Sequence, residues 1–298
     1  MGTEHSNGHH SPESGVTGTE VLDLVAAASR SLPIPTQATG ESRARAALPA
    51  TVPATPRRRY SGLTLTVVLP TLNEAENIEP VLRQLDRFDD ILVVDGMSAD
   101  GTVEVARRVR PDVRVLQRPA RGKGDALRAG FAEATGDVVV IMDADGSMDP
   151  GEVDVFTAMI AVGFDLVKGS RLACGGGSHD LTTIRLLGNA ALCKLANVLF
   201  HTHWTDLCYG YLAFRRDCLP RMGLRSDGFE IESEILGRAA LAGMRIAEIP
   251  SVELPRIAGD SHLDARRDGS RILKTMLMAR FTPRTRRAAS ALRPLTRH

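Results

Sequence analysis

Short apolar runs alternate with amphipathic segments through the first half of the chain. The runs at 64–69, 91–95 and 138–142 are rich in β-branched residues. Continuous runs of this kind are typical of strands buried on both faces of a parallel sheet. Between them, apolar residues recur at helical spacing, for example along 78–85. A regular succession of strand and helix predicts an α/β fold with a doubly wound, mainly parallel sheet.

The second half of the chain continues this pattern less regularly. Two short strands are expected there, at 164–168 and 244–250, while 209–214 reads as a loop followed by a strand; in the first half a further short strand is expected at 113–116. One amphipathic helix is predicted from five apolar residues at helical spacing, Ile184, Leu187, Ala191, Leu195 and Val198. Two later helices are expected, one burying Ile235, Leu236 and Ala239 and one over 272–278, with a polar loop at 256–267.

Composition divides the chain into three parts. Residues 1–60 hold six prolines among Ser, Thr, Gly, Ala and His, and such a segment buries too little apolar surface to offset its ordering entropy. We therefore expect a disordered extension at 1–60, a folded domain at 61–282 and a basic tail at 283–298. From residue 269 onward there are eight basic side chains and no acidic one. This segment is either a solvated tail or a contact with an anionic membrane surface.

Whole-chain properties exclude several classes of function. A net charge of +1 and 4% aromatic residues argue against nucleic-acid binding. Four cysteines without C-x-x-C spacing suggest neither a zinc site nor a disulfide framework. No apolar run approaches the roughly 18 residues that span a bilayer, and no signal peptide is evident. These features predict a cytoplasmic protein.

Candidate chemistry lies where the run at 138–142 ends. It is followed directly by Asp143, Ala144, Asp145 and Gly146. Ligands of open α/β sheets bind beyond the carboxyl ends of the strands, so both carboxylates are expected in that crevice. Hard oxygen ligands suit Mg²⁺ or Mn²⁺, which often share their shell with substrate phosphates. The sequence contains neither G-x-G-x-x-G after the first strand nor a P-loop, which argues against dinucleotide-binding and P-loop NTPase sites.

Several motifs in this order resemble family 2 glycosyltransferases of the GT-A fold, in the branch of dolichyl- or polyprenyl-phosphate sugar synthases. The resemblance covers about residues 64–282. The motifs that carry it are Leu69-Pro70-Thr71-Leu72-Asn73-Glu74, Val94-Asp95 with Ser98 and Gly101-Thr102, Gly122-Lys123-Gly124, Asp143-Ala144-Asp145-Gly146, Gly169-Ser170-Arg171, Asp206 with Gly210, Phe214-Arg215-Arg216, Gly228-Phe229 with Glu232, and Arg256 with Gly259 and Ser261.

The resemblance implies a role for each of these positions. The expected nucleotide-sugar site comprises Pro70, Thr71, Asn73, Glu74, Asp95, Lys123, Asp143, Ala144, Asp145, Arg256 and His262. The expected metal ligands are Asp143, Asp145 and Ser147, for Mg²⁺ or Mn²⁺. The expected acceptor side comprises Arg171, Arg185 and Asp206. The expected catalytic residues are Asp145, Arg256, Asp206 and Glu232. A general base is required only if the acceptor is a hydroxyl, and the candidates for it, which the sequence does not rank, are Asp206, Glu230 and Glu232.

Three positions depart from the family pattern. Asp95 is followed by Gly96 where a second acid is usual, which removes a possible ribose or base contact. Ser147 stands where Gln is frequent, and His262 stands where Lys is usual in the closing loop. An imidazole at that place either contacts phosphate or metal, making activity more dependent on pH, or is simply exposed.

The leading hypothesis is a metal-dependent inverting glycosyltransferase that moves a hexose from a GDP- or UDP-sugar to polyprenyl phosphate, with peripheral membrane contact through the basic tail. A second hypothesis is a soluble glycosyltransferase acting on a small-molecule hydroxyl, such as a secondary metabolite or a glycerate derivative. A sugar-nucleotide pyrophosphorylase is disfavoured, because no Gly-rich loop directly follows the first strand. A catalytically silent nucleotide-sugar-binding domain is disfavoured by the presence of both Asp143 and Asp145.

Overall fold

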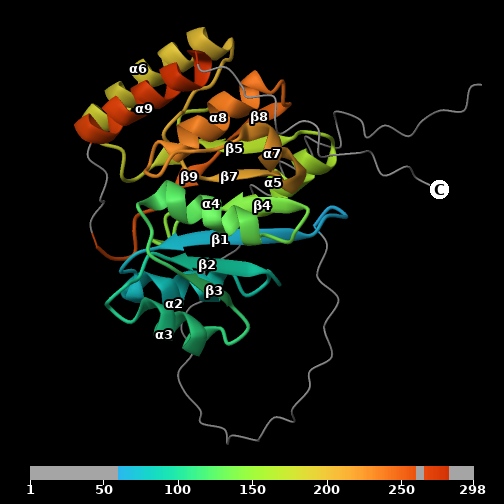
Figure 1. Cartoon of the computed structure of the whole chain (residues 1–298), viewed down its shortest axis with the longest axis vertical. Coiled ribbons are helices and arrows are strands. Elements are labelled where there is room, and N and C mark those ends of the chain that lie inside the picture. Colours follow the sequence, from blue (N-terminus) through green and yellow to red (C-terminus); the bar gives the residue numbers. More distant parts are fainter. Residues whose placement is uncertain (1–59, 260–264, 282–298) are drawn as a thin grey trace, which may run out of the picture. The chain divides into compact units, whose positions relative to one another are not determined.

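The computed structural model describes residues 60–259 and 265–281 (Figure 1). His262, the expected extension at 1–60 apart from Tyr60, and the expected tail at 283–298 lie outside the described residues.

A seven-stranded sheet carries the described domain (Figure 1). Its strand order is β3-β2-β1-β4-β7-β5-β8, and β7 runs antiparallel to both of its neighbours. The strands are β1 (Leu65–Thr71), β2 (Ile91–Asp95), β3 (Arg114–Gln117), β4 (Val138–Ile141), β5 (Leu166–Ser170), β7 (Leu212–Arg215) and β8 (Ile246–Pro250). The doubly wound, mainly parallel sheet predicted from the sequence is confirmed.

The register of the parallel strands brings the carboxyl ends of β1 and β4 to the same side of the sheet. Val67 of β1 lies opposite Ile91 of β2 on one side and Val140 of β4 on the other. Ile141, the last residue of β4, pairs with Val68, and β1 runs on to Thr71, so both strands end toward the same side of the sheet. The chemistry-bearing loops after both strands therefore start from neighbouring points.

Helices cover both faces of the sheet. They are α2 (Ala75–Gln84), α3 (Thr102–Val109), α4 (Lys123–Glu133), α5 (Val153–Ala161), α6 (Thr183–Phe200), α7 (Leu219–Met222), α8 (Ile231–Leu241) and α9 (Ala265–Phe281), with 3-10 turns η1 (Pro150–Glu152) and η2 (Arg216–Cys218). Alternate residues of β1 point to opposite faces: Val67 joins a core with α2, α3 and α5, whereas Val68 joins a core with α4, α6, α8 and α9.

Some elements differ from the sequence prediction. The loop and strand expected at 209–214 are confirmed, since β7 begins at Leu212, but the polar loop expected at 256–267 gives way to α9 at Ala265. Helix α5 and a small two-stranded sheet, β6 (Gly177–Ser178) with β9 (Val252–Glu253), were not predicted. Strands of two residues are too short to leave a period in the sequence.

Helix α6 forms where predicted, but the expected apolar face is not the buried one. Ile184, Leu187 and Val198 are 74%, 66% and 67% exposed. The buried face consists of Asn189, Cys193, Ala196 and Phe200. By length and composition α6 is also long and apolar enough to cross a bilayer, alone among the helices of the described residues, which corrects the expectation that no such segment exists. Because core helices of soluble proteins pass the same test, this is weak evidence for a span.

Candidate active site

A cleft of about 470 Å³ opens at the carboxyl ends of β1 and β4. Its walls include Asp143, Ala144, Asp145 and Ser147 from the loop after β4, and Lys123 from the start of α4. This placement follows from the sheet, since the exits of adjacent parallel strands lie side by side. The expectation that both aspartates reach one crevice is confirmed.

Lys123 is shared by two carboxylates. Its Nζ lies 2.6 Å from Oδ1 of Asp143 and 2.7 Å from Oε1 of Glu232, at the start of α8. Burial alone would lower the pKa of Lys123, but the charges of Asp143 and Glu232 outweigh it and raise that pKa above its ordinary value. Burial raises the pKa of Glu232, against the opposing charge of Lys123. Lys123 is therefore held as a cation at the floor of the cleft.

The glycines beside Lys123 let the chain reach this position. A Cβ on Gly122 would lie 2.6 Å from the carbonyl oxygen of Asp227, and one on Gly124 would lie 2.5 Å from that of Ser226. Contacts that short do not occur, so the start of α4 can pack against this backbone only with glycine at both positions. The Gly-Lys-Gly motif thus places the ammonium group of Lys123.

Arg256 pairs with the second aspartate. Its Nη2 lies 2.8 Å from Oδ2 of Asp145, and the backbone N–H of Ile257 donates to the carbonyl oxygen of Asp145. The N–H of Ser147 donates to Oδ1 of Asp145, and its carbonyl oxygen accepts from Leu254. These bonds tie the segment after β9 to the aspartate loop, so Arg256 lines the same cleft as Lys123.

The loop after β1 contributes a second wall. Pro70, Thr71 and Glu74 line the cleft. Burial raises the pKa of Glu74; Asn77 and Arg256 oppose the shift, and Asp145 and Asp143 add to it. Asn73 has a φ of 56° and accepts from the N–H of Ala99 through Oδ1, so this side chain fastens the loop. A direct nucleotide contact by Asn73 stays a prediction.

Asp95 is fully buried at the end of β2. Its Oδ1 accepts from the hydroxyl of Thr71 at 3.2 Å, and its Oδ2 accepts from the N–H of Ser98 at 2.9 Å and the amide of Gln117 at 3.3 Å. Both carboxylate oxygens thus bind within the protein and connect the loops after β1 and β2. Its implied contact with base or ribose stays a prediction.

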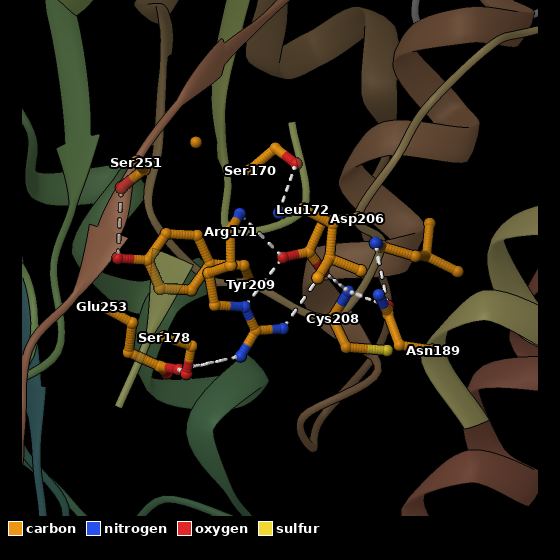
Figure 2. A network of polar contacts seen from close by, with 12 residues as sticks. Ser170, Arg171, Leu172, Ser178, Asn189, Asp206, Cys208, Tyr209, Ser251 and Glu253 are labelled. Atoms are coloured by element: carbon orange, nitrogen blue, oxygen red, sulfur yellow. Dashed lines mark hydrogen bonds and ion pairs between the residues drawn. The ribbon is translucent and has the colours of Figure 1, made fainter. Parts of the chain in front are cut away.

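Arg171 and Asp206 form a buried pair (Figure 2). Nε of Arg171 lies 2.7 Å from Oδ2 of Asp206, and Nη2 lies 3.1 Å from Oδ1, so the contact is bidentate. The Arg171 guanidinium also donates to Glu253 at 3.2 Å and lies over the ring of Tyr209. Burial would raise the pKa of Asp206, but the hydrogen bond and charge of Arg171 lower it.

This geometry argues against two of the implied roles. Asp206 is fully buried, its carboxylate is occupied by Arg171, and its pKa is lowered, which is the opposite of what a general base needs. Arg171 lines the cleft but already has two carboxylate partners, Asp206 and Glu253. The sequence missed Glu253, because nothing in the spacing of a two-residue strand marks it as a partner of Arg171.

Arg185 marks the far end of the cleft. It lies in the first turn of α6, lines the cleft and pairs with Asp180 at 3.2 Å. Asn189, one turn later, accepts through Oδ1 from the N–H groups of Leu207 and Cys208. Among the described residues its Nδ2 is buried without a partner. The cleft thus extends from Asp145 to the surface of α6.

The side chains of the cleft can hold a divalent cation only if other ligands complete its coordination shell. Asp143 and Asp145 offer carboxylate oxygens, the ligand type that Mg²⁺ and Mn²⁺ prefer. Within the described residues no group of three His, Cys, Asp or Glu side chains is placed to hold a metal ion. Diphosphate oxygens and water would have to complete the shell. Lys123 and Arg256 now neutralise the two carboxylates, as a metal would.

Comparison with known proteins shows the family of the chain. The sequence profile described as glycosyl transferase family 2 matches residues 66–223. A dolichyl-phosphate hexose transferase of Haloferax volcanii is 31% identical over 231 residues, which cover 76% of this chain and 98% of that protein. An undecaprenyl-phosphate mannosyltransferase of Micrococcus luteus is 33% identical over 214 residues, covering 67% and 88%.

A solved structure has the same fold. Glucosyl-3-phosphoglycerate synthase from Mycobacterium tuberculosis, in complex with Mn²⁺, UDP and glucosyl-3-phosphoglycerate, superposes with a TM-score of 0.61 at 26% identity. The match covers 76% of this chain and 82% of that one. The GT-A fold expected from the sequence motifs is confirmed.

Proposed function

The chain belongs to glycosyl transferase family 2, and within that family we propose that it moves a hexose from a nucleoside diphosphate sugar to the phosphate of a polyprenyl lipid, with inversion at the anomeric carbon. The two relatives named for transfer to dolichyl phosphate and undecaprenyl phosphate support this choice of acceptor. The contacts in the cleft support it independently.

The donor end of the cleft suits a diphosphate. We propose Asp143 and Asp145, with Ser147 through water, as the residues that hold a divalent cation, which when bound would stabilise the charge on the departing diphosphate. Lys123 pairs with Asp143 and Arg256 with Asp145, and both cations would donate to the oxygens of a diphosphate bound there. Pro70, Thr71 and Glu74 would flank the nucleoside, with His262 of the closing segment as a further proposed contact.

The observation that carries the choice of acceptor is the pairing of the cleft carboxylates. Glu232 is bound to Lys123, and Glu253 is bound to Arg171 and to the hydroxyl of Ser178. Asp206 is buried against Arg171, and Glu230 does not line the cleft. Glu74 does line it, but beside Pro70 and Thr71 at the proposed nucleoside end, where its Oε2 accepts from the amide of Asn77. A hydroxyl acceptor needs a carboxylate free to take its proton, whereas a lipid phosphate arrives as an anion and needs none.

The reaction then needs no proton transfer. An oxygen of the acceptor phosphate forms a bond to the anomeric carbon while the bond from that carbon to the diphosphate oxygen breaks. The electron pair leaves with the nucleoside diphosphate. Arg256 supplies bidentate donors to the charge that develops there, and Arg185 provides a cation at the acceptor end of the cleft.

A small-molecule hydroxyl is the second candidate acceptor. The neighbouring structure of glucosyl-3-phosphoglycerate synthase favours it, as does Glu232, whose raised pKa suits a base if Lys123 moves away. In that case Glu232 would take the hydroxyl proton as the oxygen attacks the anomeric carbon.

The two candidates differ in where the protein works. Transfer to a lipid phosphate places the enzyme peripherally at the cytoplasmic face of a membrane, which we propose as its location. Transfer to a small hydroxyl compound leaves it in the cytoplasm.

The test is the release of nucleoside diphosphate from UDP-, GDP- and dTDP-hexoses with Mn²⁺, with and without a short-chain polyprenyl phosphate. Release that increases with the lipid and is lost in Asp145→Asn supports the proposal. Asp154→Asn is the matched control, because Asp154 pairs with Arg87 on an exposed surface away from the cleft. Release that glycerate-type acceptors stimulate and the lipid does not would favour the second candidate.

A further inference from the structure

Helices α6 and α9 carry apolar side chains that the rest of the described domain leaves uncovered. We propose that this two-helix surface docks on an anionic lipid bilayer and presents the mouth of the cleft to the lipid phosphate. The proposal rests on the proposed function for its acceptor, but the docking itself is a separate physical property. The surface consists of Ile184, Leu187, Val198, Leu273, Leu277, Met278 and Phe281.

The exposed residues form stripes along both helices. On α6, Ile184 and Leu187 lie one turn apart, and Val198 continues the same side three turns later. On α9, Leu273, Leu277 and Phe281 recur every four residues; Leu277 is 38% and Phe281 70% exposed. A contiguous apolar patch on a soluble domain usually marks an interaction surface.

The two stripes belong to neighbouring helices. Helices α6 and α9 pack against each other and against α8, on the side away from the sheet (Figure 1). Nε of Arg280 on α9 donates to the carbonyl oxygen of Leu199 on α6 at 3.1 Å. Their buried sides, with Ala196 and Met276, complete the core above α8. Each helix therefore has a buried side to anchor it and an apolar side left over.

The charges of these helices select the partner. The two helices contain seven basic residues, Arg185, Lys194, Arg266, Arg267, Arg271, Lys274 and Arg280, and one acidic residue, Asp268. Asp268 is buried, and Arg271 pairs with it at 3.7 Å. The sequence after Phe281 adds five arginines and no acid. An apolar stripe flanked by basic residues is the composition of helices that lie in an anionic membrane surface.

A second copy of the chain fits this surface less well. Pairing two copies through α6 and α9 would bring like charges together around the contact, which disfavours association. An anionic bilayer attracts the same basic residues and accepts the apolar side chains.

The cleft opens at this surface. Ile184 and Arg185 of α6 and Gly269 and Ile272 of α9 line its outer end, and Ile184 belongs also to the apolar stripe. A lipid phosphate at the level of the headgroups would therefore meet Arg185 while its chain remained among apolar side chains. No extraction of the lipid into water is needed.

Co-sedimentation with vesicles tests the docking without any transfer reaction. We expect the full chain to bind phosphatidylcholine vesicles containing phosphatidylglycerol more tightly than vesicles of phosphatidylcholine alone. Replacing both Leu187 and Phe281 by Gln should weaken binding by about tenfold or more, since each substitution removes an apolar side chain that the bilayer would bury. Val162→Gln is the matched control, because Val162 is 42% exposed but lies on neither helix. Thermal unfolding confirms that all variants are folded.

Each outcome decides the proposal. Binding that depends on phosphatidylglycerol and is weakened only in the Leu187→Gln, Phe281→Gln variant supports it. If the chain does not bind the vesicles, or if the double variant binds them as tightly as Val162→Gln does, the proposal is overturned. It is also overturned if the chain binds no vesicles but forms a dimer that the same two substitutions abolish.

A transfer assay separates the docking from the proposed function. The double variant should transfer hexose to a short-chain, water-soluble polyprenyl phosphate as the wild type does, and lose transfer to a long-chain one in vesicles. Vesicle binding without transfer to either lipid would leave the docking intact and overturn the proposed function. Equal transfer by the double variant and the wild type to the vesicle-bound lipid would overturn the role of docking.

Discussion

Lys123 and Arg256 are the partners of two aspartates whose motif, read in the sequence alone, does not reveal them. Each aspartate of the Asp143-Ala144-Asp145 motif is paired with one of these cations, at 2.6 Å and 2.8 Å. The sequence predicts the residue types and the strand end that carries them. It does not predict the pairing, because Lys123 and Glu232 are more than a hundred positions apart and meet only through the packing of α4 and α8.

Removing the Lys123 cation tests its place in the donor site. We expect Lys123→Met to lower kcat by about a hundredfold, because a preorganised donor to the departing diphosphate is lost. Steady-state kinetics with a fixed acceptor gives the value, and Arg83→Met, an exposed cation on α2, is the control. Unchanged kcat in Lys123→Met would show that the ammonium group only holds Asp143 and Glu232 in place.

Breaking the Arg171–Asp206 pair tests whether it is structural. Asp206→Asn leaves the buried guanidinium without its bidentate partner, and we expect a loss of about 3–5 kcal/mol in the free energy of unfolding. Urea denaturation measures it. Asp217→Asn is the control, since its pair with Arg215 is exposed and worth little. Full stability of Asp206→Asn together with lost activity would instead return Asp206 to a catalytic role.

At the scale of elements, the carboxylate of Glu152 holds the start of β9 in the small second sheet. Glu152 of η1 accepts from the N–H of Val252 at 3.1 Å and from the hydroxyl of Ser251, at the start of β9. Burial raises the pKa of Glu152 to about 6, although these two hydrogen bonds oppose the shift. Strand β9 carries Glu253 and leads to Arg256, so this contact bears on the cleft.

The raised pKa gives a stability change of known sign. Glu152 binds its proton more tightly in the folded state, so its contribution is fully present below about pH 4.5 and is lost as the pH rises through about 6. We expect the wild type to lose on the order of 1–2 kcal/mol relative to Glu152→Gln across that interval. Urea midpoints of both proteins at several pH values measure the difference. A difference that is constant with pH, or that grows in the opposite direction, contradicts the assignment.

Helix α6 shows that an apolar period predicts a helix without showing which face of that helix is buried. The sequence correctly predicts a helix over 184–198, but Ile184, Leu187 and Val198 face outward. An apolar period shows that a face avoids water and does not show what covers it. Asn189 and Cys193 instead form the buried side, and such small or polar residues give no strong signal.

At the scale of the whole molecule, the order of strands could be predicted only in part. Buried parallel strands were recognisable from β-branched runs such as 91–95 and 138–142. The strand β7 was also expected, but its antiparallel direction and its place between β4 and β5 were not, because strand direction leaves no trace in composition. The cleft wall beside β1 and β4 follows directly from the parallel half, whereas the wall around Arg171 depends on long-range contacts such as Arg171 with Glu253.

For the whole molecule as a catalyst, we propose that the acceptor is an anion that needs no base. It is tested most directly by transfer of labelled hexose, from the nucleotide sugar found active, to a polyprenyl phosphate and to the matching polyprenol. We predict a labelled lipid product with the phosphate, none with the alcohol, and loss of the product in Asp145→Asn. Transfer to the alcohol, or to a small hydroxyl compound in preference to the lipid phosphate, would contradict the claim.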